Sequence, residues 1–205
     1  MKIKVCGMRD PANIRKVAAL HPDLLGFIFY SRSPRYVGEW IQEALSAAHE
    51  PIIKTGVFVN EDIDTIDQLI DAHGLDAVQL HGAESPEVCA ALRDRAKVIK
   101  AFGVNEQFDM QVLKPYVGVV DHFLFDTKTE AHGGSGVTFD WRVLDSYQLE
   151  VPFFLSGGLS LENLESVKNL QHPAFYGVDL NSRFETGPGI KDIDRLRKAF
   201  EILRA

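Results

Sequence analysis

Residues 3–8, IKVCGM, are the stretch from which the fold can be inferred. An apolar run with β-branched residues is typical of a buried strand, and a helical pattern begins soon after it, at Asp10-Pro11. Parallel α/β folds build active sites from side chains delivered at the carboxyl ends of such strands. Cys6, at the end of this run, is therefore a candidate for chemistry. The alternative is a small hydrophobic residue that fills the core, as many free cysteines do.

The alternation of an apolar run, a short turn and an amphipathic helix recurs eight times along the chain. The expected strands are residues 3–8, 24–29, 52–59, 77–82, 97–102, 122–126, 152–158 and 175–180. The expected helices are residues 11–20, 40–49, a segment around 63–70, 86–96, 107–114, a helix that opens at Asp140, 161–170 and 193–203. Eight such units with short connections predict an α/β fold, a parallel eight-stranded (β/α)8 TIM barrel. An open doubly wound sheet is the competing fold, but the Gly-rich dinucleotide turn it usually carries is absent after the first strand.

Composition narrows the function classes. The chain has 205 residues and shows no linker or composition break, so we expect a single catalytic barrel domain over residues 1–205. A net charge of −7 argues against nucleic acid or an anionic membrane as the partner. No apolar run approaches a membrane span, and no signal peptide is expected behind Lys2 and Lys4. Two isolated cysteines, Cys6 and Cys89, suggest a reducing compartment, and we expect a cytoplasmic protein that is a monomer or homodimer.

Polar and titratable residues follow the ends of otherwise apolar strands. In a barrel, the segments just past each strand meet on one face. These residues are Cys6 with Arg9, Arg35, Asn60, His81, Asp126, Gly157 with Gly158, and Asp179 with Asn181 and Ser182. Core packing does not explain why polar residues should cluster at one end of apolar strands, so we expect this face to carry the active site.

Two of these turns are typical of a phosphate cradle. SGG at residues 156–158 follows the seventh strand, and NSR at residues 181–183 follows the eighth. Glycine lets backbone N–H groups approach an anion, and the N-terminus of a short helix adds its dipole. The expected phosphate-binding residues are Gly157, Gly158, Asn181, Ser182 and Arg183. The alternative for the glycine pair is a tight turn without a ligand.

Cys6 and Asp126 are expected on roughly opposite sides of the barrel mouth, on the first and sixth strands. A thiolate can take a proton and a protonated carboxyl can give one, so the pair could move protons on both sides of a small substrate. A capping or salt-bridging carboxylate is the alternative for Asp126. Arg35, in a polar loop after Pro34, is either a bidentate clamp on a carboxylate or an exposed surface arginine.

The histidines do not predict a metal site. His81 follows an apolar strand, where it either contacts the substrate or hydrogen-bonds neighbouring backbone. The other six histidines show no ligand spacing, so no metal is expected. Residues 132–136, HGGSG, lack the Gly-Lys-Ser/Thr of a phosphate loop and are expected to form a mobile lid over the mouth.

Over essentially the whole chain, the ordered series of motifs resembles the phosphoribosylanthranilate isomerase family of tryptophan biosynthesis. The motifs are KVCGM at residues 4–8, GFIF at 26–29 with SPRYV at 33–37, QLHG at 79–82, FDT at 125–127, GGSG at 133–136 with FDW at 139–141, LSGGL at 155–159 and ETGPGIKD at 185–192. Each motif alone is a weak signal, and their order along the chain makes the resemblance specific. One departure is NSRF at residues 181–184, where the family commonly has a Ser-rich turn followed by glycine. Arg183 there either adds a charged phosphate contact or points to solvent.

The resemblance implies an Amadori rearrangement that needs no cofactor or metal. The family converts N-(5-phosphoribosyl)anthranilate to the open-chain carboxyphenylamino-deoxyribulose phosphate. By the same resemblance, Asp126 is the general acid that protonates the ring oxygen, and Cys6 is the general base that removes the C2 proton. Arg35 would hold the anthranilate carboxylate, and Asp179 would help to position the substrate. His81 is expected among the substrate-binding residues as well.

Two other functions stay open at this point. The first is a related sugar-phosphate isomerase with another aglycone, for example an aminoimidazole, which would share the phosphate site. The second is a non-catalytic barrel that binds a sugar phosphate without turning it over. The presence of both Cys6 and Asp126 beside the phosphate turn argues against the second.

Overall fold

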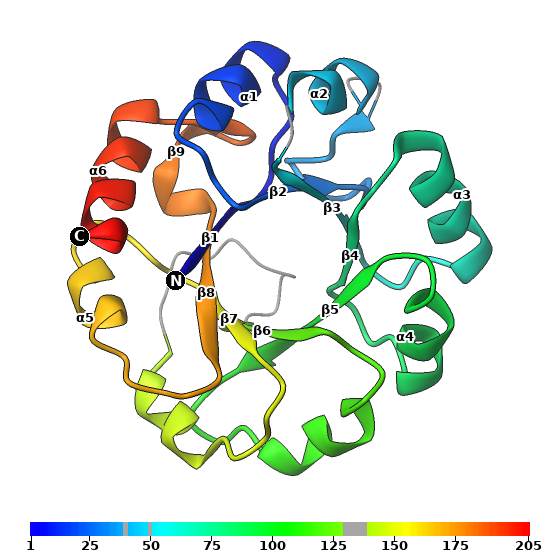
Figure 1. Ribbon diagram of the computed structural model, residues 1–205, viewed down its shortest axis with the longest axis vertical. Coiled ribbons are helices and arrows are strands. Elements are labelled where there is room, and N and C mark those ends of the chain that lie inside the picture. Colours follow the sequence, from blue (N-terminus) through cyan, green and yellow to red (C-terminus); the bar gives the residue numbers. More distant parts are fainter. Residues whose placement is uncertain (39–40, 49–50, 129–138) are drawn as a thin grey trace.

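Eight parallel strands close into a barrel with helices around it (Figure 1). The computed structural model describes residues 1–38, 41–48, 51–128 and 139–205. The strands are β1 Lys2–Val5, β2 Leu24–Ile28, β3 Ile53–Phe58, β4 Ala77–Leu80, β5 Lys97–Val104, β6 His122–Thr127, β7 Phe153–Leu155 and β8 Phe175–Leu180. Hydrogen bonds join each strand to the next, and β8 pairs with β1 to close the ring. The (β/α)8 barrel expected from the sequence is therefore confirmed.

The α-helices lie outside the ring and begin where local caps allow. They are α1 Pro11–Ala18, α2 Ile41–Ala47, α3 Ile63–His73, α4 Pro86–Leu92, α5 Leu164–Lys168 and α6 Ile193–Arg204. Asp10 caps α1 by accepting from the Asn13 backbone N–H at 2.6 Å, and Pro11 takes the first helical position. None of the helices in the described part of the chain has the length and apolarity of a membrane span.

Three expected helices differ from the structure. The segments after β5 and β6 form 3₁₀-helices, η2 Met110–Tyr116 and η3 Trp141–Ser146, instead of α-helices. Pro115 lies inside η2 and has no backbone N–H to donate, which disfavours an α-helical ladder there. α5 is a short helix within the expected 161–170. The ends of the expected helix 40–49 lie outside the described residues.

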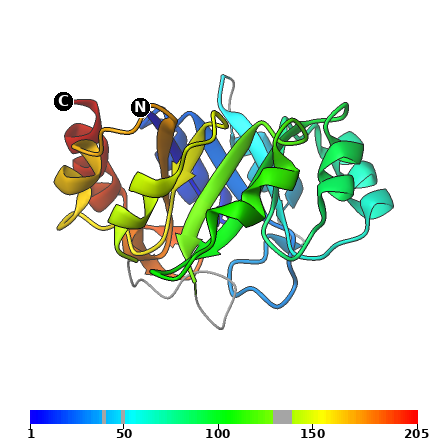
Figure 2. The same cartoon turned by 90° about the horizontal axis from the view of Figure 1, so that it is seen from below.

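A small hairpin follows β8 and was not expected from the sequence. The 3₁₀-helix η4 Ser182–Phe184 leads into β9 Glu185–Gly187, which pairs antiparallel with β10 Ile190–Lys191. Figure 2, a side view, shows both chain termini at one end of the barrel. The hairpin and the loop after β2 lie at the other end, where the parallel strands finish (Figure 2).

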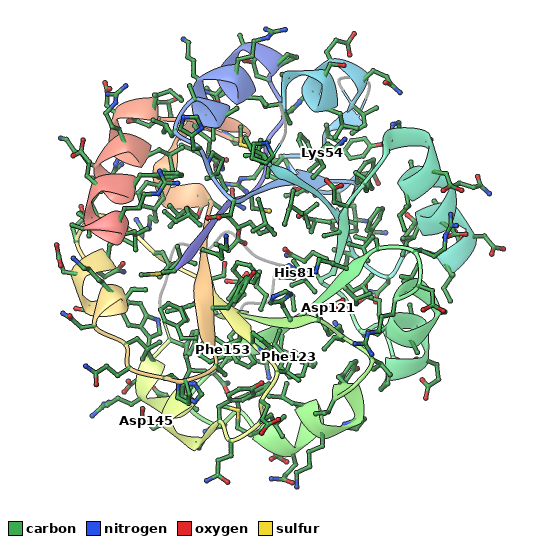
Figure 3. All side chains as sticks on the ribbon, viewed as in Figure 1. Lys54, His81, Asp121, Phe123, Asp145 and Phe153 are labelled. Carbon is green, nitrogen blue, oxygen red and sulfur yellow. The ribbon has the colours of Figure 1, made fainter. Side chains whose placement is uncertain are left out.

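Strand alternation decides which side chains enter the barrel. Large apolar side chains such as Phe123 and Phe153 pack between the strands and the helices (Figure 3). A smaller cluster fills the barrel interior with Leu24, Ile99, Ala101, Leu124 and Phe154. Because side chains alternate with period two, residues two positions further along these inward-facing rows also enter the barrel. Those positions carry the polar groups of the site.

Candidate active site

Cys6 lies just past the end of β1 and faces the barrel interior. Its backbone N–H donates to the Leu180 carbonyl at 3.0 Å, which extends the β1–β8 ladder to this residue. The residue is 3% exposed. A Cβ built on Gly26 of β2 would lie only 2.7 Å from the Cys6 Sγ, so the thiol occupies space that a larger residue on β2 would take. A neighbouring glycine therefore makes room for the candidate base.

A buried ion pair lies beside this thiol. Lys4 Nζ is 3.0 Å from Asp179 Oδ1, and both side chains are almost completely buried. Burial alone would lower the pKa of Lys4, but the neighbouring Asp179 and Cys6 outweigh it, so its pKa lies above the ordinary value. Burial raises the pKa of the Cys6 thiol, while Lys4 acts in the opposite direction. The net effect leaves the pKa of Cys6 above its ordinary value, and the Lys4 cation reduces the cost of forming a thiolate in this interior.

Asp126 lies near the end of β6, on the same inward face as the interior residue Leu124. Its Oδ1 accepts from the Thr127 backbone N–H at 2.8 Å, and its Oδ2 is 3.5 Å from His81 Nε2. Figure 3 shows His81 inside the ring of strands. A Cβ on Gly157 would lie 2.8 Å from Asp126 Oδ1 and 2.3 Å from Thr127 Oγ1, so only glycine fits against this carboxyl group. The structure thus brings together three of the residues expected at the site.

Gln79 of β4 contacts one nitrogen of the His81 ring. The Gln79 side-chain Nε2 is 2.8 Å from His81 Nδ1. With the amide N–H as donor, Nδ1 is an acceptor, and the ring proton lies on Nε2, the atom that faces Asp126. Both ring nitrogens of His81 therefore lie against side chains, Nδ1 against Gln79 and Nε2 against Asp126. Burial raises the pKa of Asp179, which interacts electrostatically with Asp126 and His81, so the acid and base ends of the site belong to one charge network.

Arg35, in the loop after β2, is held by a carboxylate from the other end of the chain. Its Nε lies 3.0 Å from both Glu185 carboxylate oxygens, and its Nη2 lies 2.7 Å from Oε2. The Arg35 side chain keeps 14% exposure, so it is neither buried nor a free surface arginine. Among the described residues, hydrogen bonds of the Arg35 guanidinium are made by Nε and Nη2, and none is made by Nη1.

Glu185 has a second cationic partner. Lys191 Nζ, completely buried, donates to Glu185 Oε1 and to Asn181 Oδ1, both at 2.7 Å. Burial would raise the pKa of Glu185, but Arg35 and Lys191 outweigh it and hold the pKa below its ordinary value. Burial lowers the pKa of Lys191, and Glu185 opposes that shift. A Cβ on Gly7 would lie 2.7 Å from Arg35 Cδ and 2.8 Å from Asn181 Oδ1, so this network packs against the residue after Cys6.

The turns expected to bind phosphate have backbone geometry suited to close approach. Gly157 and Gly158 have φ values of 82° and 63°, in the left-handed region that favours glycine. The Asn181 side chain is engaged by Lys191, and Ser182 opens the 3₁₀-helix η4. Arg183 is exposed on this turn. Phosphate binding by these residues stays a prediction.

A sequence model of the family described as N-(5'-phosphoribosyl)anthranilate (PRA) isomerase matches residues 3–202. The chain belongs to this family. A relative of that name from Parabacteroides distasonis is 50% identical over 200 residues, which cover 96% of this chain and 90% of the relative. The family and the isomerase class expected from the sequence, an enzyme of tryptophan biosynthesis, are confirmed.

Solved structures of phosphoribosylanthranilate isomerases superpose closely on the chain. The crystal structure of the Thermotoga maritima protein has a TM-score of 0.88 and 34% identity, and the match covers 100% of this chain and 98% of that one. A family member in complex with reduced 1-(o-carboxyphenylamino)-1-deoxyribulose 5-phosphate has a TM-score of 0.84 and 31% identity, with the same coverage. The barrel architecture is thus shared over the full described length.

Four residues of this isomerase site were not assigned a role from the sequence: Lys4, Gln79, Glu185 and Lys191. A charged or amide side chain inside an apolar strand is a signal that could have pointed to Lys4 and Gln79. The expected lid at residues 132–136 lies outside the described residues. Within residues 1–38, 41–48, 51–128 and 139–205, no group of three or more His, Cys, Asp or Glu side chains could hold a metal ion.

Proposed function

We propose that this chain isomerises N-(5'-phosphoribosyl)anthranilate to 1-(2-carboxyphenylamino)-1-deoxyribulose 5-phosphate by general acid–base catalysis. The observation that carries the proposal is the inward placement of Cys6 and Asp126 in a barrel of this isomerase family. Each group has a polar neighbour, since Lys4 lies beside the thiol and His81 lies beside the carboxyl group. The reaction is proposed to use neither a cofactor nor a metal.

The proposed steps move one proton at each end of the substrate. Protonated Asp126 gives its proton to the ribose ring oxygen, the C1–O bond breaks, and the nitrogen lone pair forms a Schiff base. The Cys6 thiolate then removes the proton from C2. The C2–H electron pair forms a double bond between C1 and C2, and the electron pair of the C1–N double bond returns to nitrogen, which gives an enolamine. The Cys6 thiol then gives its proton to C1 of the enolamine, and the Asp126 carboxylate takes the C2 hydroxyl proton, which gives the ketone and returns both groups to their starting states. Lys4 stabilises the thiolate between these steps.

Binding roles follow from the positions of the remaining residues. Arg35 is proposed to hold the anthranilate carboxylate through the guanidinium edge that Glu185 does not use. His81 and Asp179 are proposed to contact the sugar between the acid and the base. The phosphate is proposed to lie against backbone N–H groups of the turns after β7 and β8. Its binding residues would be Gly157, Gly158, Asn181, Ser182 and Arg183.

A fluorescence assay that follows consumption of phosphoribosylanthranilate tests the proposal. Cys6→Ala and Asp126→Asn are each expected to lower kcat by about two orders of magnitude or more, the scale of a lost acid or base. Full turnover by the Asp126 variant would discard its assignment. Turnover of an aminoimidazole carboxamide ribonucleotide without anthranilate activity would favour the alternative aglycone, and calorimetric binding without product would favour a non-catalytic barrel.

The organisation of the protein is proposed on the same basis. A single catalytic domain over residues 1–205 agrees with the strands that close from β1 to β8 and with α6 packed outside them. Cys6 and Cys89 are both free thiols, which supports a reducing compartment, the cytoplasm. The partner is proposed to be a small phosphorylated molecule with an anthranilate group, with no nucleic acid or membrane partner, and the protein a monomer or homodimer.

A further inference from the structure

We propose that Glu185 is a positioning residue that sets the specificity of this site for a substrate carboxylate. It does so by fixing the guanidinium of Arg35, and the inference rests on the proposed role of Arg35 above. Glu185 lies on β9, in the hairpin after β8, and is separated from Arg35 by 150 positions in the sequence. Its role is therefore a product of the fold and not of a local motif.

The geometry leaves Arg35 one orientation. Both oxygens of Glu185 lie 3.0 Å from Nε, and Oε2 lies 2.7 Å from Nη2, so the pair joins one whole edge of the planar guanidinium. Arginine has several rotatable bonds, and holding its fork in place before the ligand arrives reduces the entropy lost on binding. The edge formed by Nη1 and the second N–H of Nη2 is then presented to a planar acceptor with two oxygens.

The charges around Glu185 favour an anionic ligand. One carboxylate faces two cations, Arg35 at 2.7 Å and Lys191 at 2.7 Å, so the three groups together carry a net charge of about +1. Lys191 is completely buried, and it bonds Asn181 as well as Glu185. The Arg35 side chain is 14% exposed whereas Lys191 is completely buried, so Arg35 is the cation of this cluster that a ligand can reach. A ligand carboxylate completes this cluster.

A purely structural role is the alternative. Gly189 N–H donates to Glu185 Oε1 at 3.1 Å, so the same side chain also ties the hairpin together. If Glu185 only held the hairpin together, its loss would weaken the binding of every ligand and lower the stability of the protein. Loss of a positioning residue would weaken only ligands that carry the carboxylate. Comparing two ligands that differ by this group therefore separates the two roles.

The test measures competitive inhibition by two compounds, the reduced carboxyphenylamino-deoxyribulose phosphate and the same compound without its ring carboxylate. The wild-type protein is expected to prefer the carboxylate compound. In Glu185→Gln, which keeps size and removes charge, the net positive charge of the cluster rises but the guanidinium of Arg35 is no longer held in place. Because the proposed role is positioning, the preference is expected to fall by about tenfold or more, the scale of a lost charged hydrogen bond. KM for the substrate should rise in proportion, while kcat changes by less than about threefold.

Matched variants keep the test decisive. Glu185→Asp retains the charge but has a shorter side chain, so it should lose part of the preference for the carboxylate compound. This variant replaces the glutamine variant in the test if the latter does not fold. Asp67→Asn breaks an exposed ion pair in which Asp67 lies 2.6 Å from Arg95, and it should leave both inhibitors unaffected. An unchanged preference in both Glu185 variants, or an equal loss for both compounds, overturns the inference. Absence of any carboxylate preference in the wild type instead overturns the role proposed for Arg35.

Discussion

A methyl group added at Gly26 should displace the proposed base and slow the reaction without removing any catalytic atom. Gly26 lies on β2 and its added Cβ would stand 2.7 Å from Cys6 Sγ, 3.1 Å from Cys6 Cα and 3.2 Å from Cys6 Cβ. Ordinary contacts of a Cβ are 3.4–4 Å. Its φ lies outside the left-handed region, so Gly26→Ala adds a steric effect and no backbone strain.

The size of the displacement follows from these distances. Restoring an ordinary contact moves the sulfur by about 0.7–1.3 Å relative to β2. A misplacement of about 1 Å in a reacting group can cost about 10²-fold in rate. We therefore expect kcat to fall by about 10²-fold in Gly26→Ala, with KM changed far less. Overpacking should also cost about 1–3 kcal/mol of stability.

A second glycine supplies the control. A Cβ on Gly56 of β3 would meet Leu75 Cδ1 at 2.7 Å and Phe58 Cε2 at 2.8 Å, the same degree of crowding away from the thiol. Both variants are assayed by substrate fluorescence and by urea unfolding. Gly56→Ala should lose similar stability and keep the wild-type kcat. Wild-type kcat in Gly26→Ala, or an equal loss of kcat in both, would refute the reasoning about the position of the thiol.

Three further results are expected. Lys4→Met leaves Asp179 buried without its cation, so urea unfolding should show a loss of about 3–5 kcal/mol, and an unchanged midpoint would contradict a tight pair. The pKa of Glu185 is lowered in the folded protein, so its contribution to stability is complete above its ordinary value of 4.5 and is lost as the pH falls below it. The decline in urea midpoint between about pH 5 and pH 3 should accordingly be shallower in Glu185→Gln. In Gln79→Leu, ¹⁵N spectra of His81 should gain the Nδ1–H tautomer, and a single Nε2–H tautomer would show that Gln79 does not set it.

The barrel could be predicted from the sequence because its signal is local and repeated. Each buried strand is a short apolar run, and strand ends carry Cys6, His81, Asp126 and Asp179. Parallel connectivity then places all the ends on one face, so these groups had to gather there. The pairing of His81 with Asp126 at 3.5 Å agrees with that expectation.

The residues of the site that the sequence analysis missed depend on long-range contacts, which local sequence patterns do not encode. Lys4 is a charged residue in an apolar strand, and only the register of β1 with β8 gives it Asp179 as partner. Glu185 follows β8 and Arg35 follows β2, the two strands that flank β1, so the closed barrel brings them together although 150 positions separate them. The segment of η2 has a helical sequence pattern, which does not distinguish the 3₁₀-helix that forms there, with Pro115 inside it, from an α-helix.

The hairpin of residues 185–191 has a consequence for how the enzyme matures on the ribosome. The proposed acid and base have been synthesised by residue 126, yet Glu185 and Lys191 follow 59 and 65 positions later. Arg204 Nη1 then bonds the Leu20 carbonyl at 3.0 Å, which ties the last helix to the first. A nascent chain that has not yet reached Glu185 therefore holds both proposed proton-transferring groups but has no anchored guanidinium to orient a substrate between them.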